Sequence, residues 1–180
     1  MIHGLDTGFL VAAEVTEHVE HTGARDTLAR LLSAGDLIAI APQVLAEFIH
    51  IVTDPRRFVQ PLDMTAARQL AEQWWTAREV VRVFPDDAAT RQFLAWLQQF
   101  SLGRRRLLDT LLAATYRQAG IQSLLTTNQA DFLVFGVVGT VVYCAFLWWA
   151  RRVLHLSVIR EVFAGRGARG AQPSVPIEGP

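Results

Sequence analysis

The chain has 180 residues, of which 51% are hydrophobic, and its formal net charge is +0 at neutral pH. This length allows one domain with a buried core, and the hydrophobic share excludes a chain that is disordered throughout. A large, uniformly basic surface is also excluded, so any contact with nucleic acid has to come from local basic patches.

Short apolar segments alternate along the chain with longer segments of helical periodicity. Apolar runs that end at glycine, proline or polar residues predict buried strands within 2–5, 36–41, 80–85 and 121–127. Helical spacing, with end signals such as Pro42 and Gly120, predicts helices within 24–35, 42–53, 65–77, 86–100 and 107–120. Loops are expected at 6–8, 54–63 and 101–106. This alternation predicts an α/β domain in which helices flank a mostly parallel central sheet.

The C-terminal part has a different character. Residues 132–150 contain no charge, and two arginines follow. That length is close to the ~20 residues of a membrane-spanning helix, but Gly136 and Gly139 interrupt it. We therefore expect the domain to occupy 1–142 and to end in a last strand, followed by an extra apolar or amphipathic helix over 143–164 and a disordered tail over 165–180. Membrane contact through residues 132–152 stays open as the alternative.

The cellular compartment is indicated by two features of the sequence. The single cysteine, Cys144, allows no intrachain disulfide, which agrees with a reducing environment. The first residues lack a basic segment and carry Asp6 early, so we expect no secretory signal. A cytoplasmic protein is the resulting expectation.

Acidic residues stand where strands end and helices begin. Asp6 follows the first strand, Asp109 falls in the first turn of a helix, and Asp131 lies in the loop after the strand within 121–127. Each is explained separately as a turn or cap residue. Ligands of parallel sheets bind beyond the carboxyl ends of the strands, where these acids would meet. Because carboxylates held close together repel one another unless a cation neutralises them, they predict a site for a hard divalent cation.

Glu47 is the fourth acidic residue of this predicted site. It lies in a helix that is apolar on nearly every side, so we expect its carboxylate to be buried. Burial of an unpaired charge is costly, which means that Glu47 needs a partner. His50 one turn later, an arginine and a metal ion are the partners that the sequence leaves open.

Polar and basic residues near these acids are the remaining candidates. Thr7, Thr126 and Asn128 either donate hydrogen bonds to a ligand or only shape their loops. The run Arg104–Arg106 precedes Asp109 and forms either a solvated charge cluster or a phosphate-binding patch. The histidines and the cysteine show no zinc-ligand spacing, and no nucleophile motif surrounds a serine or the cysteine.

Three sequence features together resemble the PIN-domain ribonucleases, and most of all the VapC-type toxins of type II toxin–antitoxin pairs. They are the Asp-Thr-Gly after the first strand, the helical Glu47, and the segment RLLDTLLAATYRQAGIQSLLTTNQADF. The most specific part reads D-x-x-x-A-A followed by T-x-N-x-x-D-F. The resemblance extends from Met1 to about Val137.

The resemblance implies a three-layer PIN-like α/β fold and a Mg²⁺- or Mn²⁺-dependent endoribonuclease. Asp6 and Asp109 would hold the principal metal ion, and Glu47 and Asp131 would bind a second ion or orient the attacking water. The Arg104–Arg106 loop would hold the RNA backbone. A cognate antitoxin would cover the acidic cleft with an arginine, and the toxin would be a homodimer.

Two departures from the family pattern accompany this resemblance. Many relatives carry an acid where this chain has Asn128, and family members usually end shortly after the last strand. Residues 143–180 therefore resemble an extension, a fusion or the product of a shifted reading frame. These departures keep an alternative function open, namely a catalytically idle PIN-like module that binds another protein, with or without membrane association.

Overall fold

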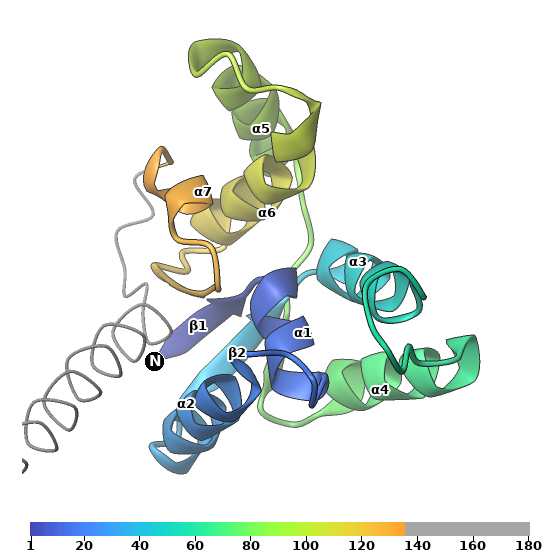
Figure 1. The fold of residues 1–180 in the computed structure, drawn as a ribbon. Helices are drawn as coiled ribbons and strands as arrows, with labels where there is room; N and C mark the ends of the chain where they lie inside the picture. Colours follow the sequence, from blue (N-terminus) through green and yellow to red (C-terminus); the bar gives the residue numbers. More distant parts are fainter. Residues whose placement is uncertain (136–180) are drawn as a thin grey trace, which may run out of the picture. The chain divides into compact units, whose positions relative to one another are not determined.

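A four-stranded parallel sheet forms the centre of the computed structural model, which describes residues 1–135 (Figure 1). Its spatial order is β3-β2-β1-β4, and its strands are β1 (Ile2–Leu5), β2 (Leu37–Ile40), β3 (Val80–Arg82) and β4 (Ser123–Leu125). β1 pairs in parallel with both β2 and β4, and Leu5 lies opposite Leu125. Each strand falls within a range predicted from the sequence, so the prediction of a parallel α/β sheet is confirmed.

Helices cover both faces of this sheet. They are α1 (Thr7–Glu14), α2 (His21–Ser33), α3 (Pro42–Val52), α4 (Met64–Thr76), α5 (Asp87–Gln99), α6 (Leu107–Gln118) and the short α7 (Ala130–Leu133). The chain moves in one direction from β1 through β2 to β3 and then crosses back to β4. Because such crossovers are right-handed, α1 to α4 lie on one face and α5 and α6 on the other (Figure 1). This confirms the predicted three-layer arrangement.

Local signals in the sequence account for several helix ends. Asp63 and Asp86 precede α4 and α5, and each carboxylate accepts a hydrogen bond from the main-chain N–H three residues on. Pro42 is the first residue of α3, where its missing N–H is not needed. Gly35 and Gly120 follow α2 and α6 with φ of +80° and +72°, a conformation that favours glycine.

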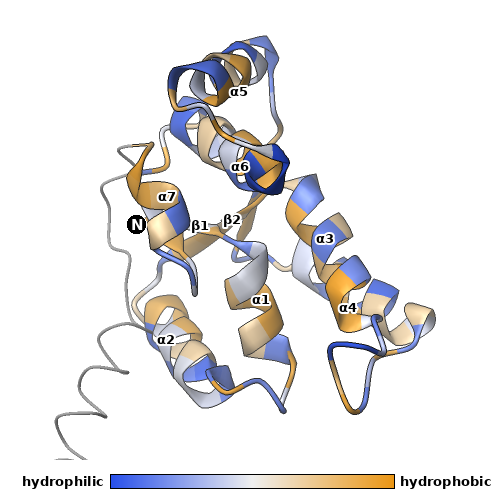
Figure 2. Ribbon diagram, turned by 45° about the horizontal axis from the view of Figure 1, so that its top comes forward, coloured by the Kyte–Doolittle hydropathy of each residue, from blue (hydrophilic) through white to orange (hydrophobic). Residues whose placement is uncertain are grey.

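Tyr116 of α6 connects the helix to the centre of the sheet. Its buried hydroxyl lies 2.7 Å from the Leu5 carbonyl oxygen and 2.9 Å from that of Ala39, and it accepts a hydrogen bond from the Leu5 N–H. A Cβ on Gly4 would lie 2.7 Å from the tyrosine ring, so the ring requires glycine at this strand position. Figure 2 shows apolar colours on the strands, hydrophilic colours at helix surfaces and a strongly hydrophilic segment directly before α6.

Two of the loops expected from the sequence are helical in the structure. α1 begins at Thr7, directly after Asp6, where a loop over 6–8 was expected. Asp131 lies in the first turn of α7 rather than in an open loop. The expected basic loop contains a 3₁₀ turn at Arg104–Arg106.

The C-terminal predictions fall almost entirely outside residues 1–135. The expected last strand is replaced at its start by a turn at Val134 and Phe135, directly after α7, and its remainder lies beyond the described residues. The predicted segments 143–164 and 165–180 also lie beyond them. Within residues 1–135, no helix has the length and apolar character needed to cross a membrane.

Candidate functional site

Asp6 stands at the carboxyl end of β1, beside the end of β4. Its N–H donates a hydrogen bond to the Leu125 carbonyl at 2.9 Å, which continues the strand pairing by one residue. Thr126, the first residue after β4, donates its hydroxyl to Asp6 Oδ2 at 2.7 Å, and both side chains are buried. Although Asp6 precedes α1, its side chain makes no capping hydrogen bond. Helix capping therefore does not explain this aspartate, in contrast to Asp63 and Asp86.

The environment of Asp6 disfavours its charged form. Its side chain is only 8% exposed, and burial raises the pKa of Asp6 to about 6. The nearby carboxylates of Asp109 and Glu47 contribute to this rise in pKa, whereas the hydrogen bond from Thr126 opposes it. Repulsion among the acids is thus present in the folded chain, and a cation between them would relieve it.

Glu47 is held toward Asp6 by the start of α1. The Thr7 hydroxyl donates a hydrogen bond to Glu47 Oε2 at 2.8 Å. The sequence-based expectation of a fully buried Glu47 is wrong, since the residue is half-buried, and His50 on the same helix is exposed. The partner found in the structure is Thr7, which the sequence placed among the supporting residues.

Gly8 completes the Asp-Thr-Gly segment for a steric reason. A Cβ at this position would lie 2.7 Å from Thr127 Oγ1 and 3.4 Å from Asp6 Oδ2. Glycine therefore allows the loop after β4 to approach the start of α1. The position of Gly8 directly after Asp6 and Thr7 is the sequence signal for this close approach.

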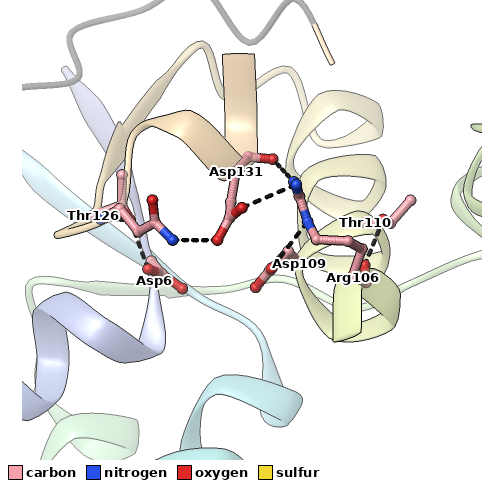
Figure 3. Close-up of polar contacts among 7 residues, drawn as sticks. Asp6, Arg106, Asp109, Thr110, Thr126 and Asp131 are labelled. Atoms are coloured by element: carbon pink, nitrogen blue, oxygen red, sulfur yellow. Dashed lines mark hydrogen bonds and ion pairs between the residues drawn. The ribbon is translucent and has the colours of Figure 1, made fainter. Parts of the chain in front are cut away.

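Asp109 reaches the same region from the first turn of α6. It is half-buried, and burial raises its pKa; the carboxylates of Asp131 and Glu47 act in the same direction, while Arg106 opposes them. Figure 3 shows Asp6, Asp109 and Asp131 facing a common region from three different elements. The structure thus brings the acids predicted from the sequence into electrostatic contact with one another.

Asp131 has partners on both carboxylate oxygens. Arg106 Nη1 lies 2.9 Å from Oδ1, and the Asn128 side-chain amide donates a hydrogen bond to Oδ2. Arg106 Nη2 also donates to the main-chain carbonyl oxygen of Asp131 (Figure 3). Asn128 therefore holds the acid in place, as a carboxylate at its position would not.

The three arginines before α6 differ in their surroundings. Arg104 and Arg105 are exposed, whereas the Arg106 side chain is only 23% exposed and turns toward the acids. Its Nε lies 3.5 Å from Asp109 Oδ2, and its guanidinium lies 5.8 Å from the centre of the Phe135 ring. The spacing of Arg106 three residues before Asp109 on a helix was the available signal for this contact.

The donor chemistry of the site fits a hard divalent cation. Its groups are carboxylates and hydroxyls, the oxygen donors that Mg²⁺ and Mn²⁺ bind. Within residues 1–135, no three histidine, cysteine or acidic side chains already converge as a set of metal ligands. Mg²⁺ keeps several of its waters and is usually bound through one or two carboxylates, so it requires no such closed cage. The raised pKa values of Asp6 and Asp109 are the structural observation that favours a cation here.

Two other hollows of the described structure lie away from these acids. One, of about 510 Å³, is lined in part by Glu17, Val52, Phe58 and Leu70. The other, of about 420 Å³, lies beside Arg25 and Trp74. Neither contains any of the four acids, so cavity size alone does not identify the functional site.

Two comparisons at the level of sequence match this chain to known proteins. A sequence model of the PIN domain matches residues 5–136. Ribonuclease VapC24 of Mycobacterium tuberculosis is 26% identical over 139 residues, a match that covers 73% of this chain and 90% of that protein.

Solved structures agree with this result at the level of the fold. Mycobacterium tuberculosis VapC20, described as a sarcin-ricin loop cleaving toxin, matches with a TM-score of 0.59 and 19% identity over 79% of this chain and 99% of its own. VapBC2 from Rickettsia felis, whose structure was solved bound to a promoter DNA fragment, matches with a TM-score of 0.53 and 20% identity. The match covers 74% of this chain and 93% of that chain. The resemblance noted in the sequence is confirmed, and the chain belongs to the PIN domain family.

Proposed function

We propose that this chain is a metal-dependent endoribonuclease and the toxin of a type II toxin–antitoxin pair, acting in the cytoplasm, where its RNA substrates are found. The observation that carries the proposal is the burial of Asp6 at the carboxyl end of β1 within electrostatic reach of Glu47 and Asp109, with the pKa of Asp6 raised to about 6. The names of the similar proteins, which include a ribonuclease VapC24 and a sarcin-ricin loop cleaving toxin, support the same assignment.

The roles of the acids follow from their surroundings. Asp6 and Asp109 would hold Mg²⁺ or Mn²⁺, because burial raises the pKa of both carboxyl groups and the charge of Asp109 adds to the rise at Asp6. Thr126 fixes the orientation of the Asp6 carboxylate. A bound cation of this kind lowers the pKa of a water and neutralises charge on phosphoryl oxygens.

Glu47 and Asp131 complete the proposed chemistry. Glu47, oriented by Thr7, would accept the proton from the attacking water or contribute to a second cation site. Asp131 would contribute to the second cation site. Arg104 and Arg105 are exposed beside the acids and would bind RNA phosphates, which makes binding dependent on salt.

Two partners are part of this proposal. An antitoxin would inhibit the nuclease by covering the acids, and an arginine is the side chain best suited to carboxylates. A homodimer is proposed from the family resemblance alone.

The alternative is a PIN-like binding module without catalysis. It is favoured by one observation, namely that no three acids within residues 1–135 already form a metal-ligand set. Expression in a bacterial host separates the two functions. We expect the parent chain to stop growth and fragment cellular RNA, and Asp109→Asn to do neither at equal protein level. If the parent and Asp109→Asn affect growth and RNA alike, the nuclease proposal is wrong.

A further inference from the structure

Arg106 connects two acids of the site through one guanidinium group. Nη1 lies 2.9 Å from Asp131 Oδ1, Nη2 donates to the Asp131 main-chain oxygen, and Nε lies 3.5 Å from Asp109 Oδ2. The Nε atom is buried and has no hydrogen-bond partner. The Arg106 guanidinium therefore makes hydrogen bonds to Asp131, whereas its interaction with Asp109 is only electrostatic.

This arrangement leaves Asp131 without a free carboxylate oxygen. Oδ1 is bonded to Arg106, and Oδ2 accepts the Asn128 amide. A carboxylate with both oxygens engaged has reduced capacity to bind a metal ion. The positive charge beside Asp109 also lowers the affinity of that region for any second cation, because like charges repel.

We propose that Arg106 is a built-in competitor of the divalent cation, which closes the acidic site in the metal-free chain and is displaced from Asp131 when the cation binds. This inference rests on the proposed function, since it assumes that the acids bind a metal ion. Release of the Arg106 guanidinium from Asp131 requires a competing cation at the carboxylate or a competing anion at the guanidinium.

The surroundings of Arg106 allow such a displacement. Its side chain is 23% exposed, so solvent reaches part of it. The helix start is anchored independently of the side chain, since the Thr110 hydroxyl donates to the Arg106 main-chain oxygen. The guanidinium can therefore leave Asp131 without unwinding α6. RNA phosphates, which arginine binds well, would then be natural acceptors for the released group.

Calorimetric titration with Mn²⁺ tests the competition directly. We expect Arg106→Gln to bind Mn²⁺ about tenfold more tightly than the parent chain, within the usual range of coupling between two ligands. Arg106→Lys should fall between them, since lysine keeps the charge but cannot make the paired contacts. The gain should shrink in an Asp131→Asn background, because the shared acceptor is absent.

Arg117→Gln is the matched control. Arg117 lies on α6, carries the same charge as Arg106 and donates a hydrogen bond to the Phe135 carbonyl oxygen, but within residues 1–135 it contacts none of the four acids. We expect its Mn²⁺ affinity to equal that of the parent. A gain of similar size in Arg117→Gln would attribute the effect to net charge and overturn the proposal.

Thermal unfolding with and without metal distinguishes competition with the cation from a purely structural role of Arg106. Arg106→Gln should lower Tm in EDTA, where the contact with Asp131 is made, and have little effect in saturating Mn²⁺, where the contact is already broken. An equal loss of Tm in both conditions would overturn the proposal.

The outcomes separate this inference from the proposed function. Equal Mn²⁺ affinity in the parent and Arg106→Gln would overturn the competition while leaving the metal site intact. If Arg106→Gln fails to fold, Arg106→Lys decides the question by the same comparison with the parent. Absence of Mn²⁺ binding in every folded variant would overturn the metal site and the competition together.

Discussion

The hydroxyl of Thr126 donates a hydrogen bond of 2.7 Å to Asp6 Oδ2 across 120 positions of sequence. This bond joins the ends of β1 and β4, which lie side by side in the sheet. It is also the contact that lowers the pKa of Asp6 most strongly against the effect of burial. One hydrogen bond therefore connects the two strand ends and also affects the charge state of Asp6.

Replacement of Thr126 by valine, which has the same shape, should raise the pKa of Asp6. The reason is that the charged carboxylate loses a hydrogen bond while remaining buried. We expect the pH of half-maximal Mn²⁺ binding to increase by about one pH unit, the equivalent of one hydrogen bond to a charged group. Titration at several pH values measures this, and an unchanged pH profile would show that Asp6 does not control metal binding.

The raised pKa of Asp6 predicts how stability depends on pH in the absence of metal. Below about pH 4, near the ordinary value of 3.8, Asp6 is protonated in both the folded and the unfolded chain. Between pH 4 and 6 only the unfolded chain releases this proton, so the contribution of Asp6 to stability falls as pH rises and stays unfavourable above pH 6.

Asp6→Asn should remove this unfavourable contribution. At pH 7 in EDTA we expect the variant to be more stable than the parent by about 1–3 kcal/mol, since no buried charge has to be accommodated. Saturating Mn²⁺ should reverse the order, because only the parent binds the ion at Asp6. Thermal unfolding in the two buffers checks both statements; a variant that is less stable than the parent in EDTA would contradict the first.

Gly8→Ala should disable the site with little effect on the rest of the fold. The new Cβ would lie 2.7 Å from Thr127 Oγ1 and displace the loop after β4 from Asp6. We expect RNA cleavage to fall by at least about tenfold, given the sensitivity of catalysis to small displacements. Gly103→Ala is the control, since no atom lies within 4 Å of its added Cβ. Equal activity in the two variants would argue against the close approach at Gly8.

Asn128→Asp should make the metal-free chain less stable and its metal binding tighter. The substitution replaces a donor to Asp131 Oδ2 with a second carboxylate, so repulsion replaces a hydrogen bond. A divalent cation would relieve that repulsion. We therefore expect a lower Tm in EDTA and a larger increase of Tm on addition of Mn²⁺ than in the parent. An unchanged response to Mn²⁺ would place Asn128 outside the influence of the metal site.

The sequence predicted the position of the acids better than their contacts. Asp6 follows β1 directly and Asp109 opens α6, and the rule that parallel strands end at one edge brings them together. Helix α1 was missed because it is buried on almost every side, which removes the periodic pattern by which helices are recognised. The Asp-Thr-Gly before it also has the composition of a turn.

The distinct role of Arg106 could not be obtained from composition. Arg104, Arg105 and Arg106 are identical in type and adjacent, and only the phase of the 3₁₀ turn relative to α6 decides which one faces Asp109. The helical position of Asp131 also could not be predicted from the sequence, since α7 has 4 residues and is too short to show a periodic pattern.

Cleavage of RNA by the purified chain, in Mg²⁺, in Mn²⁺ and in EDTA, tests the central claim most directly when Asp6→Asn is measured beside it. The account predicts cleavage by the parent in either metal, none in EDTA, and none by Asp6→Asn under any of the three conditions, although this variant is folded. Cleavage that persists in EDTA, or that Asp6→Asn performs at the parental rate, would contradict the assignment of a metal-dependent nuclease site at Asp6.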